Sequence, residues 1–173
     1  MSLSHTEENY LKAIFKLSGK EEEAVSTSAI ALSMQTAAAS VTDMLKRLTE
    51  KEYVLYEKYK GARLSKTGKA VAVNLLRKHR LWETFMVEKL NFSWDEVHVV
   101  AEQLEHIQSP KLIDQLDRFL GFPKLDPHGD PIPDRDGHFE HPSPTSLADL
   151  QPGQEAVIVG VQEDSAALLR YLK

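Results

Sequence analysis

Histidine and carboxylate side chains recur at helical spacing between Lys78 and Ser109 of this 173-residue chain. His79 and Glu83 stand four residues apart, so a helix would place both on one face. A second set follows at spacings of three and four residues: His98, Glu102, Glu105 and His106. Imidazole nitrogen and carboxylate oxygen together suit a borderline divalent cation. We therefore interpret this stretch as two helices that present metal ligands.

The alternative is a polar network without a metal. Charged residues at such spacings are usually solvated, but here apolar residues surround both sets: Leu75, Leu76, Leu81, Trp82, Phe85 and Met86 around the first, and Val97, Val99, Val100, Ala101, Leu104 and Ile107 around the second. Polar groups in such surroundings need partners. The chain has no H-E-x-x-H motif, no Gly-rich phosphate loop and no G-x-S-x-G motif. The pattern thus favours a metal sensor over a hydrolase, and we expect no small organic substrate.

The composition is that of an ordinary globular protein, with 42% apolar and 27% charged residues. No apolar run approaches the ~20 residues of a membrane span, and the N-terminus does not resemble a secretory signal. We expect a cytoplasmic protein without membrane contact. Cys is absent, so any transition metal must be held by oxygen and nitrogen donors.

Charge is distributed unevenly along the chain. Residues 1–80 carry 14 Lys and Arg against 9 Asp and Glu, a balance of +5, whereas residues 81–173 carry 7 against 17, a balance of −10. A basic first part joined to an acidic remainder suggests an anionic partner for the first part. Double-stranded DNA is the expected partner.

The pattern of the first part agrees with this partner. Apolar spacing predicts helices over 6–18, with Thr6 as N-cap, over 28–33, with Ser26 or Thr27 as cap, and from about residue 37 to 50. Residues 53–56 and 62–65 flank a basic segment that contains Gly61, which indicates a β-hairpin. Two short helices with a tight turn, followed by a basic hairpin, are typical of a winged helix-turn-helix. A solvated hairpin on a non-binding winged helix is the alternative.

DNA contacts are expected from the second helix of the helix-turn-helix and from the hairpin, or wing. The residues predicted to face bases or phosphates, or to let the helix approach them closely, are Thr36, Ala37, Ala39, Ser40, Thr42 and Asp43, and those predicted to meet the phosphate backbone are Lys46, Arg47, Lys58, Lys60 and Arg63.

The remainder is predicted to be helical and then irregular. A long helix should run from about residue 65 to Leu90 and end at Asn91, and a capping box from Ser93 to Glu96 should start the helix that carries His98. A further helix is expected over 110–120. Residues 122–144 are rich in Pro, Gly, Asp and His and predict a linker or packed loop, where His128, His138 and His141 are more simply exposed than ligating.

These motifs resemble the iron- and manganese-dependent repressors of the diphtheria-toxin-repressor and manganese-transport-regulator family. The similarity extends over the whole chain and includes TEENYLKAIFKL, RKHRLWETFMVEKL, WDEVHVVAEQLEHIQS, the PHGDPIP loop and LADLQPGQEAVIVGV. The resemblance implies a mainly α fold with a winged-helix DNA-binding domain over 1–72, a helical metal-binding and dimerisation domain over 73–121, a Pro-rich linker over 122–144 and the beginning of an SH3-like β domain over 145–173.

The resemblance also implies two metal sites. His79, Glu83 and His98 would form one, and Glu102, Glu105 and His106 the other. Relatives supply an N-terminal ligand where this chain has Asn9, so Asn9, with its neutral carbonyl oxygen, and the adjacent Glu8 are candidates, and Asp164 is a further candidate ligand. Where the iron-type branch has a Cys, this chain has Glu102. A thiolate favours the later transition metals, so a site of oxygen and nitrogen donors alone is more favourable to Mn(II).

The favoured hypothesis is a homodimeric transcriptional repressor of metal-uptake genes, with Mn(II) or Fe(II) as co-repressor and a near-palindromic operator. Co(II), Ni(II) and Zn(II) are expected to bind in vitro. Two alternatives use the same residues: a metal-dependent hydrolase, for which the sequence supplies no general base, and a winged-helix regulator controlled by an organic ligand or a partner protein.

Overall fold

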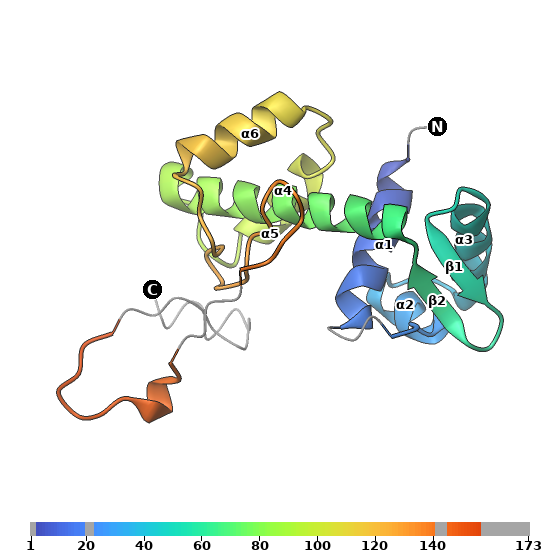
Figure 1. Cartoon of the computed structure of the whole chain (residues 1–173), viewed down its shortest axis with the longest axis horizontal. Helices are drawn as coiled ribbons and strands as arrows, with labels where there is room; N and C mark the ends of the chain where they lie inside the picture. Colours follow the sequence, from blue (N-terminus) through green and yellow to red (C-terminus); the bar gives the residue numbers. More distant parts are fainter. Residues whose placement is uncertain (1–2, 20–22, 141–144, 157–173) are drawn as a thin grey trace. The chain divides into compact units, whose positions relative to one another are not determined.

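The computed structural model describes residues 3–19, 23–140 and 145–156. Within these residues the elements are α1 (His5–Ser18), α2 (Thr27–Ser33), α3 (Ala38–Glu50), β1 (Val54–Glu57), β2 (Gly61–Leu64), α4 (Lys66–Leu90), α5 (Val97–Leu104), α6 (Pro110–Phe119) and the 3-10 helix η1 (Leu147–Asp149), as Figure 1 shows. The chain divides into two compact units, residues 1–75 and 76–173. The mainly helical fold predicted from the sequence is confirmed.

The first unit begins with a helix whose N-terminus is closed by a capping box. Ser4, rather than the predicted Thr6, is the N-cap of α1: its hydroxyl accepts a hydrogen bond from Glu7 N at 3.3 Å, and the Glu7 carboxylate accepts one from Ser4 N at 2.9 Å. This reciprocal pair satisfies two of the otherwise unpaired N–H groups at the helix start. The predicted cap was wrong because Glu7, three residues after Ser4, completes the box that Thr6 cannot form.

The helix-turn-helix is formed by α2 and α3. The Ser26 hydroxyl caps α2 by accepting from Ala29 N at 3.1 Å. By contrast, the N-cap of α3 is Ala37, which offers no side-chain hydrogen bond. Apolar side chains of both helices pack against α1 and the hairpin in one core, whose buried members are Tyr10, Leu11, Ile14, Val25, Ile30, Val41, Leu45, Leu48, Val54, Ala62 and Ala72. The core thus orients the outer face of α3.

The wing is an antiparallel hairpin of β1 and β2, with Val54 opposite Leu64 and Glu57 opposite Gly61. Backbone hydrogen bonds of 2.8 Å in each direction between Val25 and Ala62 extend the pairing to the segment before α2. Gly61 is required here, because a Cβ would lie 2.5 Å from Val25 O. The wing is therefore anchored to the helix-turn-helix by main-chain contacts.

The second unit contains most of α4, together with α5 and α6. Buried side chains form two clusters on this unit: Leu81, Ile113, Leu116 and Ile132 in one, and Met86, Val97 and Ala101 in the other. Asn91 ends α4 in the left-handed conformation, as predicted, with φ +57°. The predicted capping box forms only in part: the Ser93 N–H donates to the Glu96 carboxylate at 3.1 Å, but the Ser93 hydroxyl donates to the same carboxylate instead of capping the helix, and α5 starts at Val97. At the other end of α5, Glu105 is the C-cap, with its N donating to Ala101 O at 2.9 Å, and His106 follows it.

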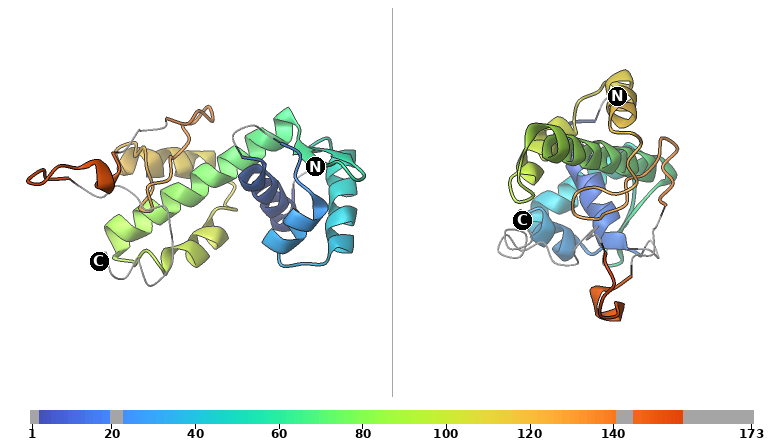
Figure 2. Two further views of the ribbon diagram at one scale, coloured as in Figure 1. Left: turned by 90° about the horizontal axis from the view of Figure 1, so that it is seen from below. Right: turned by 90° about the vertical axis from the view of Figure 1, so that its left-hand side faces the viewer.

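The Pro-rich segment folds as an irregular loop that returns to α4, as the orange trace shows in Figures 1 and 2. The buried Arg80 holds it: its guanidinium donates to Asp130 Oδ2 at 2.8 Å and to Pro131 O, and its Nε lies 3.6 Å from Asp126 Oδ2. Most of the SH3-like domain expected over 145–173 falls on 157–173, outside the described residues. No helix in the described ranges has the length and apolar character needed to cross a membrane.

Candidate metal centre

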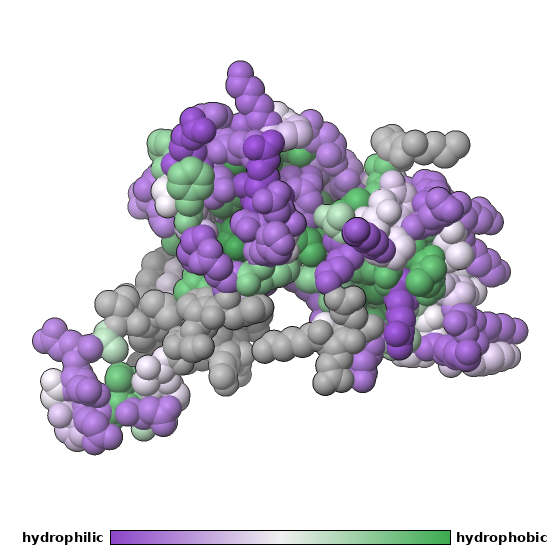
Figure 3. All heavy atoms as spheres, in the orientation of Figure 1, coloured by the Kyte–Doolittle hydropathy of each residue, from purple (hydrophilic) through white to green (hydrophobic). Residues whose placement is uncertain are grey.

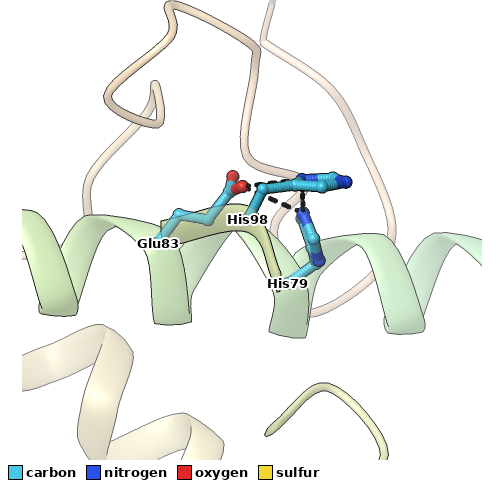
Figure 4. A group of neighbouring side chains, drawn as sticks. All are labelled: His79, Glu83 and His98. Atoms are coloured by element: carbon cyan, nitrogen blue, oxygen red, sulfur yellow. Dashed lines mark hydrogen bonds and ion pairs between the residues drawn. The ribbon is translucent and has the colours of Figure 1, made fainter. Parts of the chain in front are cut away.

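Three ligand atoms meet between α4 and α5. Figure 4 shows His79 and Glu83 rising from one face of α4 and His98 reaching them from α5. The distances are 3.0 Å from His79 Nε2 to Glu83 Oε1, 3.1 Å from His79 Nε2 to His98 Nδ1, and 3.2 Å from His98 Nδ1 to Glu83 Oε1. The resemblance to the repressor family implied this group of three, and the structure brings the three side chains together.

This nearly equilateral triangle fits a transition-metal ion. Two ligands that each lie ~2.1 Å from an ion, at a right angle, are separated by about 3.0 Å. The three atoms are thus spaced like one face of an octahedral coordination shell. Two imidazoles and one carboxylate suit Mn(II), Fe(II) and the later divalent ions of the series. The donor set and its spacing both match a bound divalent cation.

The carboxylate in this group is held in its charged form. Burial by itself raises the pKa of Glu83, whose side chain is 3% exposed, but hydrogen bonds from His79 and His98 outweigh burial and lower the pKa well below its usual value. A metal ligand must be deprotonated to bind. Glu83 therefore meets this condition throughout the physiological pH range.

His79 is oriented by a second carboxylate. Its Nδ1 lies 2.5 Å from Glu105 Oε2, and both side chains are buried. With an ion in place of the Nε2 proton, a hydrogen bond from Nδ1–H to this carboxylate would hold the ring in the tautomer whose Nε2 lone pair faces the ion. Glu105 thus contacts the first ligand set, although the sequence assigned it to the second.

The other oxygen of Glu83 faces a second group of donors, which sequence reasoning missed. His128 Nδ1 lies 3.9 Å from Glu83 Oε2, and one ligand atom from each of Glu83, Asp126 and His128 lies within 4.8 Å of the others. His128 Nε2 is 3.1 Å from Trp94 O. The only signal in the sequence was an Asp-Pro-His run inside a loop, where histidines are usually exposed.

The second predicted site is only partly assembled. Glu105 and His106 are buried, with 3.9 Å between Glu105 Oε1 and His106 Nε2, whereas the Glu102 side chain is 50% exposed and lies 3.6 Å from His98 Nε2. Among the described residues Glu102, Glu105 and His106 do not form a three-residue ligand group. Their role as one site stays a prediction.

The candidate N-terminal ligands lie in the first unit. Glu8 is buried on α1, and Asn9 Oδ1 is buried with no hydrogen-bond partner in the part of the chain that the structure describes. An orphaned carbonyl oxygen costs free energy unless it binds something. Asp164 lies outside the described residues.

The residues predicted to contact DNA are on the surface of the first unit. Thr36, Ala37, Ala39 and Ser40 are exposed at the start of α3, as are Asp43, Lys46 and Arg47 farther along, while Thr42 is half-buried and its hydroxyl donates to Ala38 O at 3.0 Å. Lys58, Lys60 and Arg63 are exposed on the wing. Figure 3 shows hydrophilic side chains over much of the visible face of this unit. Their contact with DNA stays a prediction.

Two family models match the chain. The model of the iron-dependent repressor N-terminal DNA-binding domain matches residues 2–62, and that of the iron-dependent repressor metal-binding and dimerisation domain matches residues 65–134. A solved manganese-dependent transcriptional repressor in complex with manganese is 34% identical, with a TM-score of 0.79 over 96% of this chain and 76% of its own. The chain belongs to the iron-dependent repressor family.

Other relatives agree with this membership. The diphtheria toxin repressor of Corynebacterium jeikeium is 31% identical over 151 residues, which is 86% of this chain and 62% of that protein. The manganese regulator SloR is 41% identical, with a TM-score of 0.67 over 79% of this chain and 62% of its own. The chain spans about three fifths of the length of the curated repressors that it matches. Members of this family are DNA-binding, metal-dependent repressors rather than enzymes, which speaks against the hydrolase alternative.

Proposed function

We propose that this member of the iron-dependent repressor family is a homodimeric repressor that binds DNA when Mn(II) or Fe(II) is bound. The observation that carries the proposal is the triangle of His79, Glu83 and His98, with edges of 3.0–3.2 Å, in a chain that also contains a winged helix-turn-helix. The regulated genes would be metal-uptake genes, the operator near-palindromic, and the protein cytoplasmic.

His79, Glu83 and His98 would hold one ion, with Glu105 orienting His79. Asp126 and His128, together with the second carboxylate oxygen of Glu83, would hold a second ion. Alternatively, they would complete the coordination of the first ion. The remaining predicted ligands are Glu102, His106, Asn9, Glu8 and Asp164. All are oxygen or nitrogen donors, so we expect Mn(II) to activate at cellular concentrations even though later metals bind more tightly.

DNA would be bound by α3 and the wing. Because α3 starts without a side-chain cap, its first N–H groups are available to a phosphate, and Ala37 to Ala39 allow close approach. Lys58, Lys60 and Arg63 would neutralise backbone phosphates. Metal acts as co-repressor if it binds the DNA-competent arrangement of the protein more tightly than other arrangements. DNA binding must then raise the affinity for metal by the same factor.

An electrophoretic mobility assay tests the proposal. The chelator-treated protein is titrated with Mn(II), Fe(II), Co(II), Ni(II) or Zn(II) in the presence of duplexes that the Mn(II)-loaded protein has selected from a random-sequence library. We expect binding that depends on metal and is lost in His79→Gln and Glu83→Gln. Metal-independent binding would instead favour a regulator controlled by an organic ligand or a partner.

A further inference from the structure

The wing tip carries a bulky side chain in a backbone conformation that disfavours it. Tyr59 has φ +69°, in the left-handed region that suits Gly and Asn. It occupies the third position of the turn that a 3.1 Å hydrogen bond from Lys60 N to Glu57 O closes. The strain is not offset by burial, because Tyr59 is 93% exposed. Folding of this chain therefore does not explain a tyrosine at this position.

The side chains around Tyr59 suggest what it contacts. Lys58 Nζ lies 5.0 Å from the centroid of the Tyr59 ring, and Lys60 follows directly in the chain. Glu57 is the acidic residue of the turn, and its carboxylate lies 2.7 Å from Lys60 Nζ. The wing tip thus presents one exposed aromatic ring, with Lys58 beside the ring and Lys60 next in the chain. A matching partner must offer apolar surface beside closely spaced negative charges.

The minor groove of duplex DNA has this combination, since phosphates line its rims and deoxyribose forms its walls. We infer that Tyr59 enters the minor groove that flanks the site read by α3, with its ring against deoxyribose and Lys58 and Lys60 near the phosphates. This inference rests on the proposed DNA-binding function. It makes Tyr59 a residue that senses groove width and the 2-amino group of guanine, so that flanking sequence contributes to specificity.

The test exploits opposite effects on stability and on binding. Tyr59→Gly should raise the unfolding midpoint by about 2 °C, because glycine adopts this φ without strain. The same variant, loaded with Mn(II), should bind a library-selected duplex about fivefold more weakly than wild type, because aromatic contacts to nucleic acid are lost. The salt dependence of binding should not change, since no charge is removed.

Glu52→Gly is the matched control. Glu52 is exposed, has φ +63°, and lies just before β1 in the same unit. This substitution also relieves a left-handed conformation, so it should raise the midpoint as well, but it should not weaken DNA binding.

Location in the minor groove is tested with two duplexes whose flanks differ only in having guanine·cytosine or inosine·cytosine pairs. The pairs differ by the 2-amino group in the minor groove. Wild type should prefer the inosine flanks, and Tyr59→Gly should bind both duplexes alike. Undiminished affinity in Tyr59→Gly, or an equal preference in both proteins, would overturn the inference. A wild-type protein that selects no duplex at all would instead refute the proposed function.

Discussion

His79 Nδ1 lies 2.5 Å from Glu105 Oε2, so the residue that orients one metal ligand comes from the set that the sequence assigned to a different site. The pair is buried, and it leaves His79 Nε2 directed at Glu83 and His98. A substitution at Glu105 should therefore alter the binding of an ion by His79, Glu83 and His98.

Glu105→Gln should weaken Mn(II) binding to the His79 site by about 10- to 100-fold, because the imidazole loses the carboxylate that fixes its tautomer. Calorimetric titration of the purified protein measures this affinity. In a His79→Gln background the same substitution should cause no further loss at that site. Equal losses in both backgrounds would show that Glu105 does not act through His79.

Asn9→Leu should separate stability from metal response. The orphaned Asn9 Oδ1 is replaced by an apolar group of similar size, so the metal-free protein should gain about 1–2 kcal/mol in unfolding free energy. Activation of DNA binding by Mn(II) should nevertheless require more metal, if this oxygen is a ligand. Urea unfolding and metal-dependent mobility shifts measure the two effects. A metal response equal to that of wild type would remove Asn9 from the ligand set.

The free energy of unfolding of the metal-free protein should decrease as pH rises from 4 to 6, because of Asp126. Burial, together with the nearby Glu83 carboxylate, raises the pKa of Asp126 to about 6. As pH rises, Asp126 loses its proton at a lower pH in the unfolded chain than in the folded chain. The resulting loss of folding stability is absent below about pH 4, grows as pH rises and is constant above pH 6. The full penalty is on the order of 2–3 kcal/mol.

Asp126→Asn should abolish this part of the pH dependence, because asparagine does not titrate. The loop should keep its structure, since the amide oxygen can still accept from His128 N and Asp130 N. Urea unfolding of the chelated protein at several pH values measures it. Asp149→Asn, at an exposed position, controls for the loss of a surface carboxylate. A slope between pH 4 and pH 6 that survives in Asp126→Asn would assign it to another group.

The two-fold interface is expected to include the exposed apolar side chains of α6. Phe119 is 65% exposed, and its ring centroid lies 6.1 Å from that of Phe85. Such a patch is a common site of self-association. Phe119→Glu should shift the protein toward monomer in sedimentation velocity, whereas Leu147→Glu, at a 78% exposed position in η1, should not. A folded Phe119→Glu dimer would place the interface elsewhere.

The basic residues of the wing should set part of the salt dependence of DNA binding. Replacing Lys60 and Arg63 with Ala should reduce the slope of log affinity against log salt by up to about two units. Glu57→Gln should strengthen binding at low salt, because Lys60 loses an intramolecular partner at 2.7 Å. Fluorescence anisotropy across a KCl series measures both. An unchanged slope in the double variant would remove the wing from the interface.

The sequence determined the features that depend on neighbouring residues. Spacings of three and four residues placed His79 with Glu83 and predicted the helices, Gly61 helped to mark the hairpin, and Asn91 marked the left-handed end of α4. These inferences succeeded because helix periodicity and turn chemistry act over a few residues, which a single sequence records directly. Resemblance to a known family added the pairing of His79 and Glu83 with His98.

Only the tertiary structure decided how distant segments meet. Asp126 and His128 reach Glu83 because Arg80 holds their loop against α4, a contact across about fifty residues that no local pattern encodes. Similarly, Glu105 keeps helical geometry as the C-cap of α5, where its N donates to Ala101 O at 2.9 Å, and only the packing of α5 beside α4 brings its carboxylate to His79. Burial raises the pKa of both Glu83 and Asp126, and the folded chain makes the net shifts opposite because histidines surround Glu83 whereas Asp126 lies near the Glu83 carboxylate.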